Sequence, residues 1–196
     1  SSQALLWNGT ATSSVALPPP AAQWAAAAAA RGNQQVGWAG VGNSVHAALW
    51  AGSAASWIDL GALHPAFSYA MGTDGKQQVG FIDVRGLAHA VVWTGTAESM
   101  IDLNPYAGLG GSIAYGVDDG QQVGLVGDGI SATHAALWSG TPESWVDLTP
   151  PGTTFPEARA ISRGWQAGSV FVNGFEHASV WHGSAASWID LHLLLP

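Results

Sequence analysis

Apolar residues along the chain occur in short runs separated by glycine-containing turns, and this pattern predicts β-strands. Ser112–Val117 and Gln77–Asp83 are two such runs, rich in small, β-branched and aromatic residues. Asn173-Gly174 and Asp128-Gly129 are dipeptides that favour two-residue hairpin turns between strands. Outside one alanine-rich run, no window of about 11 residues or more carries a helical period. The pattern therefore predicts an all-β fold.

One phrase recurs along the chain: His-Ala-x-x-Trp, followed after eight residues by Asp-Leu. Its Trp stands at positions 7, 50, 93, 138 and 181, so the successive spacings are 43, 43, 45 and 43 residues. A Gln-Gln-Val-Gly segment precedes the phrase three times, and Gln166-Ala167-Gly168 takes its place before the fourth. The phrase spans four complete segments and one eroded segment: His46–Leu60, His89–Leu103, His134–Leu148, His177–Leu191 and, eroded, Gln3–Leu17.

Each unit predicts four short strands: an alanine-rich or glycine-rich strand, the Gln-Gln-Val-Gly strand, the His-Ala-x-x-Trp strand and the strand that ends in Asp-Leu. Repeated four-stranded units of roughly 40–50 residues are typical of β-propeller blades. We therefore expect a single β-propeller domain over residues 1–196. Its parts are a half repeat (1–17), four repeats (18–60, 61–103, 104–148 and 149–191) and a tail (192–196).

The number of strands decides how such a propeller would close. About 4.5 repeats of about 43 residues give 18 predicted strands, so one blade has only two of its four strands. A five-bladed or near-five-bladed ring is favoured, completed by the partial blade itself, by a second chain or by further residues. A four-bladed ring with an appended hairpin is the second arrangement, and a β-solenoid is the alternative to a propeller.

The alanine-rich segment Ala21–Ala30 carries two conflicting signals. By intrinsic propensity alanine favours a helix. The segment nevertheless stands where the other units have their first strand, and small side chains suit the crowded axis of a propeller. The repeat therefore predicts an inner strand here.

Composition and charge exclude several classes of partner. The chain has 47% hydrophobic residues and 11 Trp, enough to fill a core, but only 9% charged residues. Its net charge is −8 with five basic residues spread along the chain, which argues against nucleic acid and anionic membrane surfaces. No apolar stretch reaches the roughly 18 residues of a membrane span. The absence of Cys excludes disulfides and thiolate metal sites.

The repeat unit resembles the bacterial extracellular repeat known as the HAF type. The resemblance rests on His-Ala with a Trp four residues after the His, on the preceding Gln-Val-Gly and on the trailing Asp-Leu. The matching dipeptides are His46-Ala47, His89-Ala90, His134-Ala135 and His177-Ala178. The third residue departs from the family's usual Phe, and is Ala48, Val91, Ala136 or Ser179. The resemblance implies a secreted, propeller-like protein and no settled activity.

The recurring His and Asp are interpreted as structural hydrogen-bonded pairs rather than as a metal or catalytic centre. They occur once per unit, whereas a reactive centre is normally single, and buried polar groups need partners. In the eroded copy Gln3 and Ala16 replace both members together, as expected for residues that depend on each other. The predicted pairs are His46–Asp59, His89–Asp102, His134–Asp147 and His177–Asp190.

Residues that break the repeat are the better candidates for ligand binding, because the fold does not require them. Trp24, Trp38, Trp165 and Arg163 are the predicted ligand-binding set, suited to a polar and aromatic saccharide pocket. No hydrolase, metalloprotease or nucleotide-binding motif occurs, so no catalytic residue, metal or cofactor is predicted. The sequence favours a secreted, non-enzymatic propeller that binds carbohydrate or another extracellular polymer. A structural module that forms homo-oligomers or filaments through its incomplete blade is the alternative, and a propeller hydrolase ranks last.

Overall fold

The computed structural model describes residues 3–64, 66–105, 110–127, 129 and 133–194. These residues form eighteen β-strands and six short 3-10 helices, and all of the strand pairs are antiparallel. The all-β prediction is confirmed, with four strands in each complete repeat. Asp128, of the predicted Asp128-Gly129 turn, lies outside the described residues.

The strands form one two-stranded sheet and four four-stranded sheets. The half sheet consists of β1 (Leu5–Leu6) and β2 (Val15–Ala16). Sheet 1 consists of β3 (Ala22–Arg31), β4 (Gln34–Val41), β5 (Ser44–Trp50) and β6 (Ile58–Asp59). Sheet 2 consists of β7 (Ser68–Thr73), β8 (Gln78–Val84), β9 (Leu87–Trp93) and β10 (Ile101–Asp102). Sheet 3 consists of β11 (Ser112–Asp118), β12 (Gln121–Gly127), β13 (Thr133–Trp138) and β14 (Val146–Asp147). Sheet 4 consists of β15 (Thr154–Ser162), β16 (Trp165–Val172), β17 (Phe175–Trp181) and β18 (Ile189–Asp190).

A 3-10 turn that the sequence analysis did not predict lies between the third and fourth strands of each four-stranded sheet, and between β1 and β2 of the half sheet. In sheet 1 the hydroxyl of Ser56, the last residue of this turn, accepts a hydrogen bond from the backbone N–H of Ala51 at 2.8 Å. The same bond recurs in the other sheets, so a serine fixes each turn. The turns are η1 (Ala11–Ser13), η2 (Ala54–Ser56), η3 (Ala97–Ser99), η4 (Pro142–Ser144) and η5 (Ala185–Ser187), and η6 (His192–Leu194) follows the last strand.

The alanine-rich segment is strand β3, as its position in the repeat predicted. It pairs along its length with β4, and Ala25 is buried in the core. Tertiary pairing therefore overrides the helical propensity of alanine. The equivalent strands β3, β7, β11 and β15 each contain a register shift at the same place, whose extra residue is Ala28, Met71, Tyr115 or Arg159. These β-bulges increase the local twist of each first strand.

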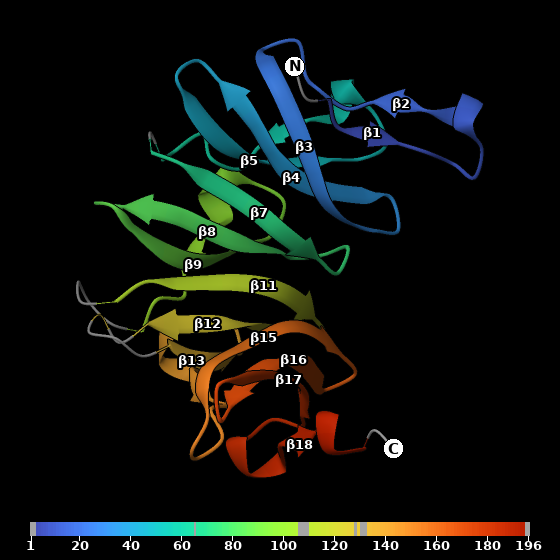
Figure 1. Cartoon of the computed structure of the whole chain (residues 1–196). Helices are drawn as coiled ribbons and strands as arrows, with labels where there is room; N and C mark the ends of the chain where they lie inside the picture. Colours follow the sequence, from blue (N-terminus) through green and yellow to red (C-terminus); the bar gives the residue numbers. More distant parts are fainter. Residues whose placement is uncertain (1–2, 65, 106–109, 128, 130–132, 195–196) are drawn as a thin grey trace.

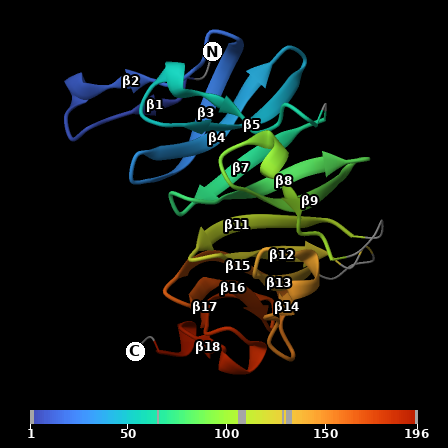
Figure 2. The ribbon, with the colours of Figure 1, turned by 180° about the vertical axis from the view of Figure 1, so that it is seen from behind.

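The sheets follow one another in a row, with the half sheet at one end and sheet 4 at the other (Figure 1). The same order is seen from behind (Figure 2). The first strands β3, β7, β11 and β15 lie side by side through the row. The described residues thus form the repeated sheets that the sequence predicted, but the two end sheets lie apart and do not close a ring. No helix in the described part of the chain is long and apolar enough to cross a membrane.

The core is divided among the junctions between consecutive sheets, and each junction repeats the same pairing of faces. Trp93 of sheet 2 packs against Leu49 and Leu60 of sheet 1. Trp138 packs in the same way on sheet 2, Trp181 on sheet 3, and Trp50 on Ala4 and Leu17 of the half sheet. Each sheet therefore carries two different faces. One presents a Trp to the preceding sheet, and the other receives the Trp of the following sheet.

Candidate functional site

Each of the four predicted His–Asp pairs forms a hydrogen bond between the third and fourth strands of its sheet. The Nδ1 atom of His46 lies 2.8 Å from Oδ2 of Asp59. The corresponding distances are 2.8 Å for His89–Asp102, 2.8 Å for His134–Asp147 and 2.7 Å for His177–Asp190.

The second oxygen of each carboxylate is also used. Oδ1 of Asp59 accepts a hydrogen bond from the backbone N–H of Gly61 at 3.0 Å. The same bond forms to Asn104, Thr149 and His192 in the following repeats. Each Asp therefore closes the loop that follows its strand while it holds the His, which leaves little capacity for a ligand.

The pair in sheet 4 is the most buried, and its environment shifts the pKa of Asp190. Burial acts to raise this pKa, but the hydrogen bond from His177 and backbone hydrogen bonds from His192 and Leu193 outweigh it. The net effect lowers the pKa of Asp190 below its usual value. The ring of His192 stacks on His177, with the ring centroids 4.4 Å apart. The carboxylate form is thus favoured by the folded structure.

The described residues contain no group of three or more His, Cys, Asp or Glu side chains arranged to hold a metal ion. The His–Asp pairs are separated from one another by the packing of the sheets.

The structure does not bring the four predicted ligand-binding residues together. Trp24 and Trp38 belong to sheet 1, whereas Trp165 and Arg163 belong to sheet 4 and the turn before β16. Sheets 2 and 3 lie between them (Figure 1). A single saccharide pocket built from this set is therefore not formed.

Each of these residues has a local structural partner. A Cβ atom at Gly40 would fall 2.4 Å from Nε1 of Trp24, so this glycine provides the space for the ring. Trp165 is 49% exposed and its ring lies 5.0 Å from that of His182. The backbone of Arg163 has a positive φ of 51°, and its N–H donates to Oδ2 of Asp118 at 2.8 Å. Arg163 therefore acts as a turn residue that connects sheets 3 and 4.

Trp38 belongs to an aromatic group that crosses from sheet 1 to sheet 2. Its ring meets Tyr69 edge to face at 5.3 Å, and Tyr69 stacks on Phe81 at 4.8 Å. All three side chains are only partly buried. The three rings therefore form one partly exposed aromatic group across the junction of sheets 1 and 2.

A second group on the first strands combines an aromatic ring with charges. Arg159 lies over the ring of Tyr115 at 5.2 Å and is hydrogen bonded to Glu157. Burial and the charge of Glu157 raise the pKa of Tyr115, and Arg159 opposes this effect. The phenol therefore stays protonated, and the charges of Arg159 and Glu157 are paired with each other.

The two ends of the row form a complementary pair of surfaces that the sequence analysis did not predict. Trp7 of the half sheet is 54% exposed, whereas its counterparts Trp50, Trp93, Trp138 and Trp181 are fully buried. We call the exposed side of the half sheet, with Leu5 and Trp7, the leading face. It presents a Trp as every sheet does, but no described residue of a preceding sheet receives it.

The opposite end presents the receiving surface. Leu191 is 37% exposed, whereas Leu60, Leu103 and Leu148 at the same position are fully buried. Ala178 is exposed and Val180 is half-buried, although their counterparts in sheets 1 to 3 are buried. We call this surface of sheet 4, formed by Ala167, Ala178, Val180 and Leu191, the trailing face.

Comparison with known proteins adds no assignment, because no family model and no curated protein matches the chain. The eroded first copy was the sequence signal for the end surfaces. In this copy Trp7 is kept although Gln3 and Ala16 replace the His and the Asp. This indicates that the Trp has a packing role that does not depend on the hydrogen-bonded pair.

Proposed function

We propose that the protein is a non-enzymatic, extracellular scaffold whose copies join head to tail, the leading face of one copy docking on the trailing face of the next. The observation that carries the proposal is the exposure of Trp7, at a position where four counterparts are fully buried. In this proposal the row of sheets is an arc of a β-propeller, which further copies extend.

The junctions inside the chain supply the template for this contact. At the junction of sheets 3 and 4, Trp181 packs against Ala135, Leu137 and Leu148. The trailing face offers Ala178, Val180 and Leu191 at the same three positions. Burying an aromatic and several aliphatic side chains favours association at roughly 25 cal/mol per Å² of apolar surface, before the costs of association. The second copy therefore meets a surface like the one that already receives a Trp at four junctions within the chain.

The two faces differ, so the contact is heterologous and produces either a closed ring or an open filament. The extracellular location is supported by the resemblance of the repeat unit and by the low content of Lys.

Light scattering coupled to size-exclusion chromatography, over a range of protein concentrations, tests the proposal. We expect oligomers that grow with concentration for the wild type, and monomers for Trp7→Ala. The matched control is Phe175→Ala, which removes an aromatic that is 72% exposed and lies outside both faces. A wild-type protein that remains monomeric at all concentrations would contradict the proposal.

A second candidate function, saccharide binding, is favoured by the partly exposed group of Trp38, Tyr69 and Phe81. Exposed aromatic rings stack on the apolar faces of sugars, and nearby polar groups can orient the ligand. Glycan-array binding by the wild type that is lost in Trp38→Ala and retained in Trp165→Ala would support this function. Equal glycan binding by the wild type, Trp38→Ala and Trp165→Ala would contradict a saccharide-binding role for this aromatic group.

A further inference from the structure

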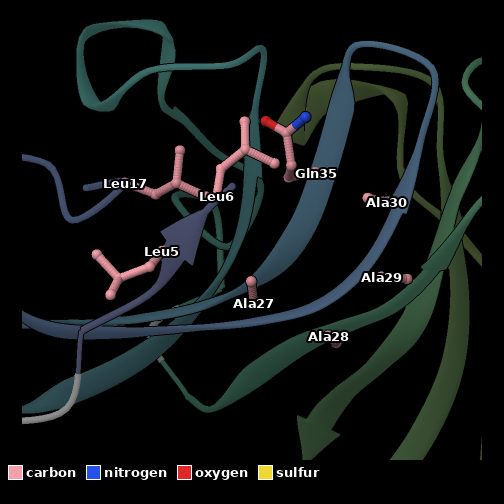
Figure 3. A pocket seen from close by; sticks show the side chains of 8 residues that line it. All are labelled: Leu5, Leu6, Leu17, Ala27, Ala28, Ala29, Ala30 and Gln35. Atoms are coloured by element: carbon pink, nitrogen blue, oxygen red, sulfur yellow. The ribbon is translucent and has the colours of Figure 1, made fainter. Parts of the chain in front are cut away.

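A cavity of about 380 Å³ lies at the turn that joins β8 to β9 in sheet 2. Its described walls are Val84, Arg85, Leu87 and His89, so they combine apolar side chains with a cation and an imidazole. A second cavity, of about 220 Å³, lies between the half sheet and sheet 1 and is lined almost wholly by leucine and alanine (Figure 3). Of these two cavities the first is the one whose walls carry a charge, and a charge can select a ligand.

Arg85 occupies a turn position that ordinarily takes a smaller residue. It follows Val84 in the two-residue turn of the hairpin, and its backbone has a positive φ of 56°. The corresponding residues are Gly42 in sheet 1, with a φ of 58°, and Asn173 in sheet 4, with a φ of 52°. Gly and Asn favour this conformation, whereas Arg does not. A long cationic side chain that the turn itself does not favour points to a role for that side chain.

The charge of Arg85 is available to a ligand. Its side chain is exposed, and within the described residues it forms no ion pair; the arginine that does so is Arg159, with Glu157. The carboxylate of the same hairpin, Asp83, accepts a hydrogen bond from the backbone N–H of Gly86 at 3.1 Å. Successive side chains of β8 point to opposite faces of the sheet, so Asp83 lies on the face opposite to the Val that lines the cavity.

His89 provides a wall that is held in one orientation. Its Nδ1 bonds to Asp102 at 2.8 Å, and its Nε2 lies 3.4 Å from Nδ2 of Asn104. Asn104 is fixed in turn, because its Oδ1 accepts a hydrogen bond from the hydroxyl of Ser112 at 2.9 Å. The other repeats have Gly61, Thr149 or His192 at the position of this Asn. The imidazole of sheet 2 is therefore a rigid surface, and a preformed wall lowers the cost of ordering the site around a ligand.

We propose that this cavity binds a small organic anion, a carboxylate joined to an apolar body. The carboxylate pairs with the guanidinium of Arg85, which presents parallel N–H donors to it. The apolar body packs on Val84, on Leu87 and on the ring of His89. Leu87 is 38% exposed, so covering it adds favourable apolar burial. The proposal does not rest on head-to-tail association, because the cavity lies in sheet 2 and away from both end faces.

Isothermal titration calorimetry with benzoate tests the proposal, and benzamide and acetate are the matched probes. Benzamide has the same ring without the charge, whereas acetate has the charge without the ring. We expect saturable binding of benzoate at one site per chain, with a Kd at least about tenfold higher for each of the other two compounds. Absence of saturable benzoate binding, or equal binding of the three compounds, would overturn the proposal.

The variant Arg85→Asn separates the role in binding from the role in the turn. Asn removes the charge and suits a positive φ, as Asn173 shows, so we expect benzoate binding to be lost without a fall in the melting temperature. The matched control is Arg163→Asn, because Arg163 has a φ of 51°, precedes a glycine in the same way and lies outside the cavity. The control is expected to bind like the wild type. Binding retained in Arg85→Asn, or lost in both variants, would overturn the proposal.

A carboxylate with an apolar body can belong to a free acid or to the C-terminus of a polypeptide. The peptide Gly-Gly-Gly-Phe, titrated with a free and with an amidated C-terminus, distinguishes these two sources. We expect the free peptide to bind no more tightly than benzoate. Binding at least about tenfold tighter than that of benzoate, and lost on amidation, would overturn the assignment to a small acid in favour of a chain end.

Discussion

Nδ1 of His177 lies 2.7 Å from Oδ2 of Asp190, and both side chains are buried in sheet 4. His177→Ala leaves the buried carboxylate without this donor, and we expect the free energy of unfolding to fall by about 1–3 kcal/mol. Urea denaturation measures the change. Asp190→Ala and the double variant complete a mutant cycle, in which the double loss is expected to be smaller than the sum of the single losses.

His182→Ala is the control for this cycle, because His182 is exposed and its side chain pairs with no Asp among the residues that the structure describes. Its effect is expected to stay within about 0.5 kcal/mol. Additive single losses at His177 and Asp190 would show that the two residues act separately, contrary to the pairing.

The lowered pKa of Asp190 predicts how stability depends on pH. A carboxyl whose pKa is lower in the folded state than in the unfolded state stabilises the fold above the unfolded pKa of about 3.9. This contribution declines as the pH falls below that value and is lost as the pH passes the folded pKa. We expect the free energy of unfolding to decrease below about pH 4, and to decrease less steeply in His177→Ala.

NMR titration of the Asp190 carboxyl checks this prediction directly. The wild type should titrate below the ordinary range of Asp, and His177→Ala should titrate higher. The same midpoint in both proteins would show that His177 does not hold the carboxylate.

Two glycines of sheet 3 are expected to respond very differently to substitution by alanine. A Cβ atom at Gly124 would fall 1.8 Å from the carbonyl oxygen of Ile113, whereas at Gly116 the nearest atom, the carbonyl oxygen of Arg159, lies 3.2 Å away. Glycine occupies the position of Gly124 in all four repeats, while Ala29 and Ala160 already stand at the position of Gly116.

We therefore expect Gly124→Ala to lower the free energy of unfolding by about 3 kcal/mol or more, and Gly116→Ala to change it by less than about 1 kcal/mol. Thermal and urea denaturation of the two variants compare them directly. Equal losses of unfolding free energy in the two variants would contradict this prediction. They would show that the close approach of β12 to the backbone of β11 does not explain why glycine is needed at position 124.

The repeat pattern predicted the local structure well, because each strand is specified by residues within its own unit. The spacing of Trp and Asp was enough to predict the four strands per unit and the pairing of His46 with Asp59. It even placed the alanine-rich segment Ala21–Ala30 in a strand against its helical propensity, and the observed strand is Ala22–Arg31. Features set by a single serine, such as the 3-10 turn at Ser56, carried too little signal among many serines.

The sequence could not predict the arrangement of the sheets, because the angle between neighbours arises from many small packing contacts. The ligand-binding prediction assumed that Trp38 and Trp165 share one surface, yet sheets 2 and 3 separate them. The exposure of Trp7 also escaped sequence analysis. Its side chain has the same identity as Trp50, and only the absence of described neighbours on one side distinguishes the two.

Head-to-tail association predicts a specific outcome when two end variants are mixed. Trp7→Ala has a damaged leading face and an intact trailing face. Ala178→Glu places a charge in the centre of the trailing face and leaves the leading face intact. Each variant alone is expected to be monomeric, since every contact would need the face that it lacks.

In the mixture one intact face of each kind remains, so one Ala178→Glu copy can dock its Trp7 on one Trp7→Ala copy. The pair exposes only damaged faces and cannot grow. We expect the mixture to give heterodimers and no larger species, measured by native mass spectrometry with one variant isotopically labelled. Ala62→Glu, which adds the same charge at an exposed alanine outside both end faces, replaces Ala178→Glu in the control and is expected to oligomerise on its own. Homodimers of either variant would instead indicate a contact between identical faces, because a symmetric interface does not require the two different ends of the row.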